Sequence, residues 1–254
     1  MSASLFEKIV QQLYAINYNG YIMLNFYNEP LLDKNLPKKI SYIRKMLPDA
    51  WILFNSNGDF LNKDLLKKLY ATGLNKIIVT LHTLPNQPYE DSDRKNAMEK
   101  FLKKLSLEKY FHRRVENPNR SIMLDISFSK TEQIFICTNN WATYGNDRGG
   151  TLEHLHGNQR TAPCVNPFRE IFIAYDGTVK PCCNIYFNCP NIYGNANEQS
   201  LTEIYFGEEL CKFRRELFTF SPKTGGCATC NTADNAEIAE QDERKKILSR
   251  CEFE

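Results

Sequence analysis

Four cysteines in the C-terminal part of the chain place the strongest constraint on its fold. The first two follow the pattern Cys164-x12-Gly177-x4-Cys182, and after a longer gap the pair Cys227-Ala-Thr-Cys230 follows. Thiolate sulfur is the ligand that iron–sulfur clusters and structural zinc sites both use. The spacing therefore predicts that these four thiols form one metal site.

A β-hairpin explains how the first two cysteines come together. Apolar residues in 168–175 and 178–181 flank Asp176-Gly177, a dipeptide typical of tight hairpin turns. The hairpin would bring Cys164 and Cys182 to one end, and a later loop carrying Cys227 and Cys230 would close the site.

The residues alone leave three interpretations open: an iron–sulfur cluster, zinc, or thiols without metal. A hairpin pair plus one CxxC motif wraps a cluster from several directions, whereas structural zinc more often uses two CxxC motifs. Cys183 neighbours Cys182, and adjacent residues seldom bind one ion well, so we assign Cys182 as the ligand. The other cysteines are expected to be core or surface thiols: Cys137, Cys189, Cys211 and Cys251.

Composition excludes several classes of function. The chain has 254 residues and a net charge of +2, which gives no electrostatic reason to expect nucleic-acid or membrane binding. No apolar run approaches the roughly 20 residues that span a bilayer, and the N-terminus lacks the pattern of a signal peptide. We therefore expect a cytoplasmic protein, in which nine cysteines are thiols or metal ligands rather than disulfides.

Short apolar runs alternate with helical patterns over the first 140 residues. Strands are predicted at 21–26, 51–54, 76–81, 121–128 and 133–137. Helices are predicted at 6–14, 40–46, 62–70, 93–105, 200–218 and 234–248. The alternation predicts an α/β fold built on a parallel sheet or barrel.

Polar residues follow three of these strands where each strand ends. They are Asn28 with Glu29, then Ser56 with Asn57, and then His82. In parallel α/β folds the carboxyl ends of the strands form the ligand site, so these residues predict a small-molecule pocket. The alternative is that turns simply begin there. Residues 139–160 are polar and glycine-rich, and include Arg148-Gly149-Gly150, as expected for an active-site loop.

Together these motifs resemble the radical S-adenosylmethionine superfamily. Tyr27-Asn28-Glu29-Pro30-Leu31-Leu32 is similar to its Gly-Glu-Pro motif, with Asn28 in place of glycine, and Ser56-Asn57-Gly58 to its Thr-Asn-Gly motif. The cysteine region resembles the superfamily's SPASM/twitch auxiliary-cluster domain in its single-cluster form.

The resemblance implies a fold, a domain division and a set of ligands. The fold would be a partial parallel (β/α) barrel lacking its first strand, followed by a small domain of a β-hairpin and helices. The boundaries would be 1–140 for the barrel, 141–163 for a linker or active-site loop, and 164–254 for the auxiliary domain. The four cysteines would bind a [4Fe-4S] cluster. Glu29, Ser56, Asn57 and His82 would bind S-adenosylmethionine, and Arg148 would contact substrate.

One motif of the superfamily is missing from the sequence. Cys-x3-Cys-x2-Cys, which binds the cluster that cleaves S-adenosylmethionine, does not occur, and no cysteine precedes Cys137. A cluster held by four thiolates has no open iron for S-adenosylmethionine. We therefore expect that the chain does not catalyse this cleavage alone, that its first strand is an exposed sheet edge, and that Met1 is an internal methionine of a longer protein.

Two functions from different classes follow. In the first, the chain is the larger C-terminal part of a radical S-adenosylmethionine oxidoreductase, and its auxiliary cluster accepts or relays an electron from a small polar or peptide substrate. A flavodoxin or ferredoxin would be its redox partner. In the second, the chain is a non-catalytic iron–sulfur or zinc protein that has lost the other cluster and serves as a binding partner.

Overall fold

The computed structural model of the chain describes residues 1–84, 86–110, 112–184, 192–232 and 238–251. The chain forms two compact units. The first, here called the sheet unit, is Leu13–Tyr144. The second, here called the cysteine unit, combines Met1–Gln12 with Gly145–Glu254. The domain boundaries expected from the sequence stay a prediction.

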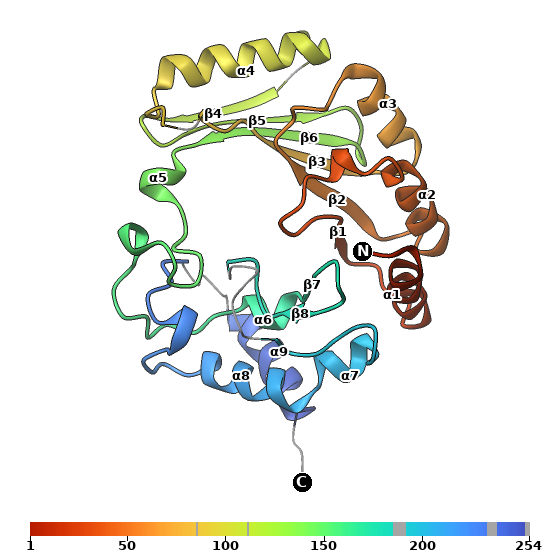
Figure 1. Ribbon diagram of the computed structural model, residues 1–254, viewed down its shortest axis with the longest axis vertical. Coiled ribbons are helices and arrows are strands. Elements are labelled where there is room, and N and C mark those ends of the chain that lie inside the picture. The colour runs from red at the N-terminus through yellow and green to blue at the C-terminus, as the bar shows by residue number, and fades with distance from the viewer. Residues whose placement is uncertain (85, 111, 185–191, 233–237, 252–254) are drawn as a thin grey trace. The chain divides into compact units, whose positions relative to one another are not determined.

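A six-stranded sheet forms the centre of the sheet unit. Its strand order is β1-β2-β3-β6-β5-β4 (Figure 1). The strands are β1 (Tyr21–Met23), β2 (Trp51–Ser56), β3 (Lys76–Thr80), β4 (His112–Asn117), β5 (Ser121–Ser127) and β6 (Gln133–Asn139). The first four strands in this order run parallel, which confirms the α/β class predicted from the alternating pattern.

The last two strands of the sheet, β5 and β4, are antiparallel to their neighbours. Their connections are too short for a crossover and must reverse the chain direction. The β5–β6 turn is closed by a hydrogen bond from Phe128 N to Glu132 O at 2.9 Å, and the β4–β5 turn uses Asn119 at a φ of 59°. The sheet is therefore mixed, and β4 was not predicted from the sequence.

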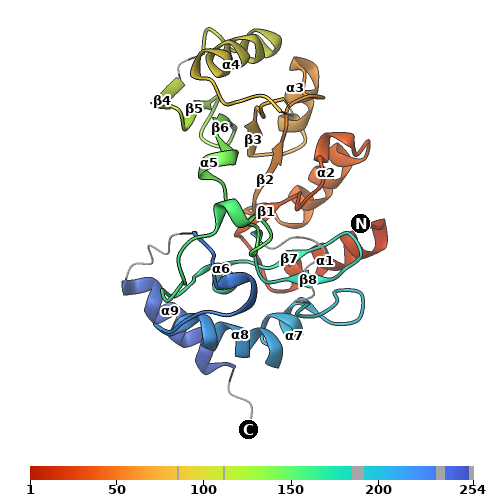
Figure 2. The same cartoon turned by 60° about the vertical axis from the view of Figure 1, so that its left-hand side comes forward.

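Three helices lie on one face of the sheet: α2 (Leu36–Met46), α3 (Lys63–Ala71) and α4 (Asp91–Leu105) (Figures 1 and 2). Asn62 caps α3 by accepting a hydrogen bond from Leu65 N at 2.9 Å, and Gly73, at a φ of 99°, follows its end. Both boundaries were predicted. Apolar residues of the central strands form the core, including Ile52, Phe54, Ile77, Val79, Ile134 and Ile136. This core fixes the strand ends that carry the expected pocket residues.

Strand β1 is an edge of the sheet, as expected. Among the described residues it pairs only with β2, and Tyr21 and Met23 are exposed. The short elements η1 (Pro30–Leu32) and α5 (Trp141–Tyr144) complete the sheet unit.

The cysteine unit is built from short elements. They are η2 (Glu153–Leu155), α6 (Asn166–Arg169), β7 (Phe172–Ile173), β8 (Val179–Lys180), α7 (Leu201–Tyr205), α8 (Glu208–Phe218), η3 (Gly225–Cys227) and α9 (Ile238–Ser249). Helices α7, α8 and α9 lie on one side of the β7–β8 hairpin (Figure 2). The beginning of α1 (Ala3–Ala15) also belongs to this unit, because Lys8 Nζ donates to the carbonyls of Ala196 and Asn197, each at 2.8 Å.

The helix predicted at 200–218 is two helices. Ser200 and Glu203 form a capping box at the predicted start, but α7 ends at Tyr205 and α8 begins at Glu208 with Gly207 as its N-cap. A Cβ at residue 207 would lie 2.9 Å from the Glu203 carbonyl oxygen, so glycine permits this close turn. The break lets α8 pack at its own angle.

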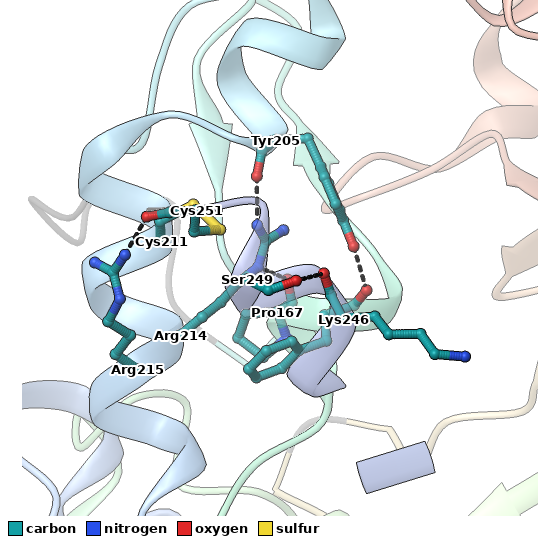
Figure 3. Close-up of a disulfide and its surroundings, with 9 residues drawn as sticks. Pro167, Tyr205, Cys211, Arg214, Arg215, Lys246, Ser249 and Cys251 are labelled. Carbon is teal, nitrogen blue, oxygen red and sulfur yellow. Dashed lines mark hydrogen bonds between the residues drawn. A yellow bond between two sulfur atoms is a disulfide. The ribbon is translucent and has the colours of Figure 1, made fainter. Parts of the chain in front are cut away.

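Cys211 and Cys251 form a disulfide, and the prediction that both are thiols is wrong (Figure 3). Cys211 lies on the buried side of α8, as expected, and Cys251 follows the end of α9. The Arg215 guanidinium donates to the Cys251 carbonyl, which holds the two segments together. Spacing alone did not indicate that α9 returns to α8. Cys189 lies outside the described residues.

Candidate functional site

The four cysteines of the predicted metal site surround one cavity in the cysteine unit. Its wall includes Cys164, Cys182, Cys227 and Cys230, together with Arg160, Asn184 and Phe213. Among the described residues, no three histidine, cysteine or carboxylate side chains converge as the ligands of a single ion would. The four thiols therefore line a space instead of meeting at a point.

Three separate segments bring these cysteines together. Cys164 precedes α6 and is fixed by a hydrogen bond from its backbone N–H to Leu217 O at 3.0 Å. Cys182 follows β8, and the predicted hairpin is present, with Phe172 opposite Lys180. Gly177 adopts a φ of 91°, and a Cβ there would lie 2.2 Å from Asn197 Nδ2. Cys227 ends η3, which brings Cys230 to the cavity.

The thiols of this cavity are hard to ionise without a cation. Burial raises the pKa of Cys182, and neighbouring Cys183, Cys227 and Cys164 raise it further, against a backbone hydrogen bond from Asn184. Burial and the charges of Cys164 and Cys230 raise the pKa of Cys227 to about 12, although Arg160 opposes this. Metal binding would replace these protons, because thiolate is the form that ligates a metal.

Two asparagines donate hydrogen bonds to the sulfur atoms. The backbone N–H of Asn184 lies 3.4 Å from Cys182 Sγ, and Asn146 Nδ2 lies 3.8 Å from Cys230 Sγ. Both side chains also donate to Thr232 Oγ1. Sequence reasoning missed these residues, because a single asparagine in a loop carries no recognisable signal.

Cys183 lies beside this site, and its carbonyl connects it to Arg148. Arg148 Nη1 lies 3.5 Å from Cys183 O. Burial and the charge of Glu170 raise the pKa of the Cys183 thiol, and Arg148 opposes this in part. Arg148 has a φ of 53°, and its backbone N–H donates to Asn146 Oδ1 at 2.8 Å. The predicted substrate residue is thus held near the cysteine cavity by its own loop.

In the sheet unit, the structure brings Glu29 together with Ser56 and Asn57. Ser56 Oγ donates to Glu29 Oε1 at 2.9 Å, and the backbone N–H of Asn57 donates to Glu29 Oε2 at 2.9 Å. Glu29 Oε1 also accepts from Leu31 N at the start of η1. These bonds fix the carboxylate at the ends of β1 and β2 and leave acceptor capacity on Oε2.

The turn around Asn28 accommodates its side chain. Asn28 Oδ1 accepts a hydrogen bond from Phe26 N at 3.1 Å, which closes a local turn. Gly58 follows Asn57 at a φ of 77°, and a Cβ there would lie 2.8 Å from Val79 and Phe101. Glycine is therefore required at this position.

His82 lies at the surface of the sheet unit, two residues after β3. Partial desolvation lowers the pKa of its imidazole, and nearby Asp59 raises it in part. Its carbonyl accepts a hydrogen bond from Arg94 at 2.9 Å. Asp59 belongs to the loop that begins with Asn57, so His82 and this loop are neighbours.

Comparison with known protein families identifies the class of the cysteine segment. Residues 164–231 match the SPASM iron–sulfur cluster-binding domain. This segment begins at Cys164 and contains all four cysteines of the cavity. This segment is thus similar to SPASM domains, and the chain as a whole is similar to an S-adenosylmethionine-dependent protein.

One relative resembles nearly the whole chain. The S-adenosyl-L-methionine-dependent 2-deoxy-scyllo-inosamine dehydrogenase of Niallia circulans is 25% identical over 250 residues, covering 98% of this chain and 86% of the relative. A crystal structure of BtrN in complex with AdoMet and 2-DOIA has a TM-score of 0.67 at 24% identity, and covers 92% of this chain and 81% of that one. An open conformation of BtrN gives 0.61 at 22% identity, with coverages of 95% and 85%. These structures confirm the fold class.

Within the described residues, no helix is both long enough and apolar enough to cross a bilayer. The cytoplasmic location stays a prediction.

Proposed function

We propose that Cys164, Cys182, Cys227 and Cys230 bind a [4Fe-4S] cluster that accepts or relays one electron during oxidation of a small polar or peptide substrate. The observation that carries the proposal is the arrangement of these four thiols around one cavity, inside the segment that matches an iron–sulfur cluster-binding domain. The protein would be the larger part of a radical S-adenosylmethionine oxidoreductase.

The residues present fit such a cluster. A tetrahedral zinc site needs four sulfur atoms about 2.3 Å from one centre. Sulfur atoms that line a cavity suit a larger group, which is bound by thiolates on several sides. Hydrogen bonds from Asn184 N and Asn146 Nδ2 would stabilise two of the ligand sulfurs.

The sheet unit would supply the cofactor-binding residues. Glu29 is held by Ser56 and Asn57 in a fixed orientation, so the free acceptor capacity of its carboxylate would bind the ammonium of S-adenosylmethionine. Ser56 and Asn57 would lie near the same molecule, and His82 beside the Asn57 loop would contact it. When bound with a three-cysteine cluster, S-adenosylmethionine supplies a radical that abstracts hydrogen.

Arg148 would orient the substrate. Its guanidinium presents a planar set of donors that suits hydroxyl or carboxylate oxygens. Its loop is anchored by Asn146, which also contacts the Cys230 sulfur. This link would place the substrate-binding arginine beside the group that takes up the electron.

The missing Cys-x3-Cys-x2-Cys motif supports a second candidate, a non-catalytic iron–sulfur or zinc protein that acts as a binding partner. Metal content separates zinc from a cluster. Cleavage of S-adenosylmethionine, assayed with a cluster-bearing partner supplied in trans, separates a partner from an oxidoreductase.

The test of the proposed cluster is anaerobic purification followed by measurement of iron, sulfide and zinc. We expect iron and sulfide in the wild-type protein and loss of both in Cys227→Ala. Cys183→Ala is the matched control, because this thiol neighbours the site without being an assigned ligand, and it should retain iron. Unchanged iron in Cys227→Ala, or zinc in place of iron, would contradict the cluster.

A further inference from the structure

The cysteine unit buries two cations next to the proposed cluster. The side chains of Arg160 and Lys223 belong to residues that are 8% and 4% exposed. Charged side chains are rarely buried unless an opposite charge accompanies them, because desolvation costs several kcal/mol per ion. The way in which the positive charges of Arg160 and Lys223 are compensated therefore needs an explanation.

The two cations donate only to backbone carbonyls among the described residues. Arg160 donates to Ala162 O at 3.1 Å, to Pro163 O at 2.7 Å and to the Thr232 carbonyl. Lys223 Nζ donates to Glu216 O at 2.9 Å and to the Thr219 carbonyl. No ion pair to a carboxylate joins either cation within the described part of the chain. Carbonyl dipoles satisfy the donors but leave the positive charge uncompensated.

Both cations lie close together and close to the cysteines. Arg160 lines the cavity, and its carbonyl accepts a hydrogen bond from Lys223 N at 2.9 Å. Burial and the charge of Arg160 lower the pKa of Lys223, whereas Cys227 and Cys164 raise it. Two like charges side by side are unfavourable unless they share an anion.

One buried carboxylate offsets part of the positive charge of Arg160 and Lys223. Asp147 is fully buried, accepts a hydrogen bond from Thr229 Oγ1 at 2.7 Å, and raises the pKa of Cys227. The two cations outnumber this buried carboxylate, and Glu216, whose charge also raises the pKa of Lys223, is exposed to solvent. The excess positive charge lies at the cavity whose thiols become anionic on metal binding.

We propose that Arg160 and Lys223 compensate the negative charge of the cluster and raise its reduction potential, so that the site favours electron uptake. The inference rests on the proposed function. Reduction adds one electron to the cluster. The electron comes from the substrate radical, which releases a proton as it is oxidised, and no bond forms or breaks at the cluster. Added negative charge is more stable near positive charge, and net charge is one determinant of cluster potential.

A structural role for the same residues makes a different prediction. Arg160 links the segment before Cys164 to the segment after Cys230, and Lys223 satisfies carbonyls at the end of α8. A residue with a purely structural role acts through the geometry of its hydrogen bonds. A residue that sets the reduction potential of the cluster acts through its charge. Substitutions that keep or remove the charge therefore separate the two roles.

The experiment is an anaerobic redox titration of the full chain reconstituted with ferrous iron and sulfide, followed by electron paramagnetic resonance. Arg160→Gln and Lys223→Met should each lower the ratio of reduced to oxidised cluster at a fixed potential about tenfold, which corresponds to about 59 mV for one electron. Arg160→Lys and Lys223→Arg should stay near wild type. Lys212→Met, at an exposed position of α8, is the control and should leave the potential unchanged.

The outcomes are distinguishable. If the wild-type protein takes up no iron and sulfide, the proposed function fails and this inference fails with it. If the cluster forms but the neutral variants keep the wild-type potential, only this inference is overturned. Equal shifts of the reduction potential in Arg160→Lys and Arg160→Gln would identify a purely structural role for Arg160. Should Arg160→Gln lose its cluster, Lys223→Met still decides the result.

Discussion

The two units of the chain are stabilised in different ways. In the sheet unit, six hydrogen-bonded strands and an aliphatic core fix the backbone. In the described part of the cysteine unit, two strands of two residues each form the only sheet. A disulfide and buried cations bonded to carbonyls add to its apolar core. The proposed metal site therefore lies where regular structure contributes least.

The candidate sites of the two units also differ in how far the chain itself prepares them for a ligand. The carboxylate of Glu29 is satisfied by donors of its own unit and is ready before any ligand binds. The thiols of Cys182 and Cys227 instead have raised pKa values, because burial and neighbouring thiols oppose their ionisation. The Glu29 site is preorganised by the chain, whereas the cysteine site would be completed by the metal that it binds.

Removal of the metal should have the largest effect and should affect one unit only. Iron chelation of the reconstituted protein should lower amide protection in the cysteine unit at least a thousandfold, about 4.1 kcal/mol, since ligand binding stabilises the folded state. Hydrogen–deuterium exchange of Cys164 and Val179 reports on this unit, and Ile77 and Ile136 report on the sheet. Equal loss of amide protection in both units would contradict the claim that the metal stabilises the cysteine unit alone.

Loss of the disulfide should have the next largest effect. The bond between Cys211 and Cys251 spans a sequence separation of 40, and closing a loop of this size stabilises a fold by about 4 kcal/mol in the chain-entropy account. Chemical denaturation should show this loss for the cysteine unit in the Cys211→Ala/Cys251→Ala double variant. A thiol reductant should destabilise the wild-type protein and leave the double variant unchanged. A response of the double variant would contradict this assignment.

The smallest effect is expected at a helix cap in the sheet unit. Asn62→Ala removes the acceptor for Leu65 N and should cost about 1 kcal/mol. Asn62→Ser should retain most of the stability, because a hydroxyl accepts the same bond. Denaturant midpoints of the two variants measure the difference. A loss confined to the cysteine unit would mean that the units are not stabilised separately.

Much of the sheet unit could be predicted, because its local signals agree with its tertiary structure. Asn62 and Gly73 mark the ends of α3, and the apolar runs before Glu29 and Asn57 mark two strands. Strand β4 was missed because its residues are mostly exposed and show no alternating apolar pattern.

In the cysteine unit, Asp176-Gly177 between two apolar runs predicted the hairpin, because turn chemistry is local. The Cys211–Cys251 pairing and the burial of Arg160 and Lys223 could not be predicted. Both depend on segments distant in sequence, and charged residues are usually exposed. The spacing of the cysteines indicated the proposed ligands, whereas their electrostatic surroundings became visible only in the structure.

The disulfide has a topological consequence. Because Cys211 and Cys251 are covalently joined, residues 211–251 form a closed ring, and Cys227 and Cys230 lie within it. A single cut in any peptide bond of this ring leaves one molecule. Two of the four proposed ligands thus stay covalently attached to α8 through Cys251 and the disulfide, even when the linear chain between them and α8 is broken.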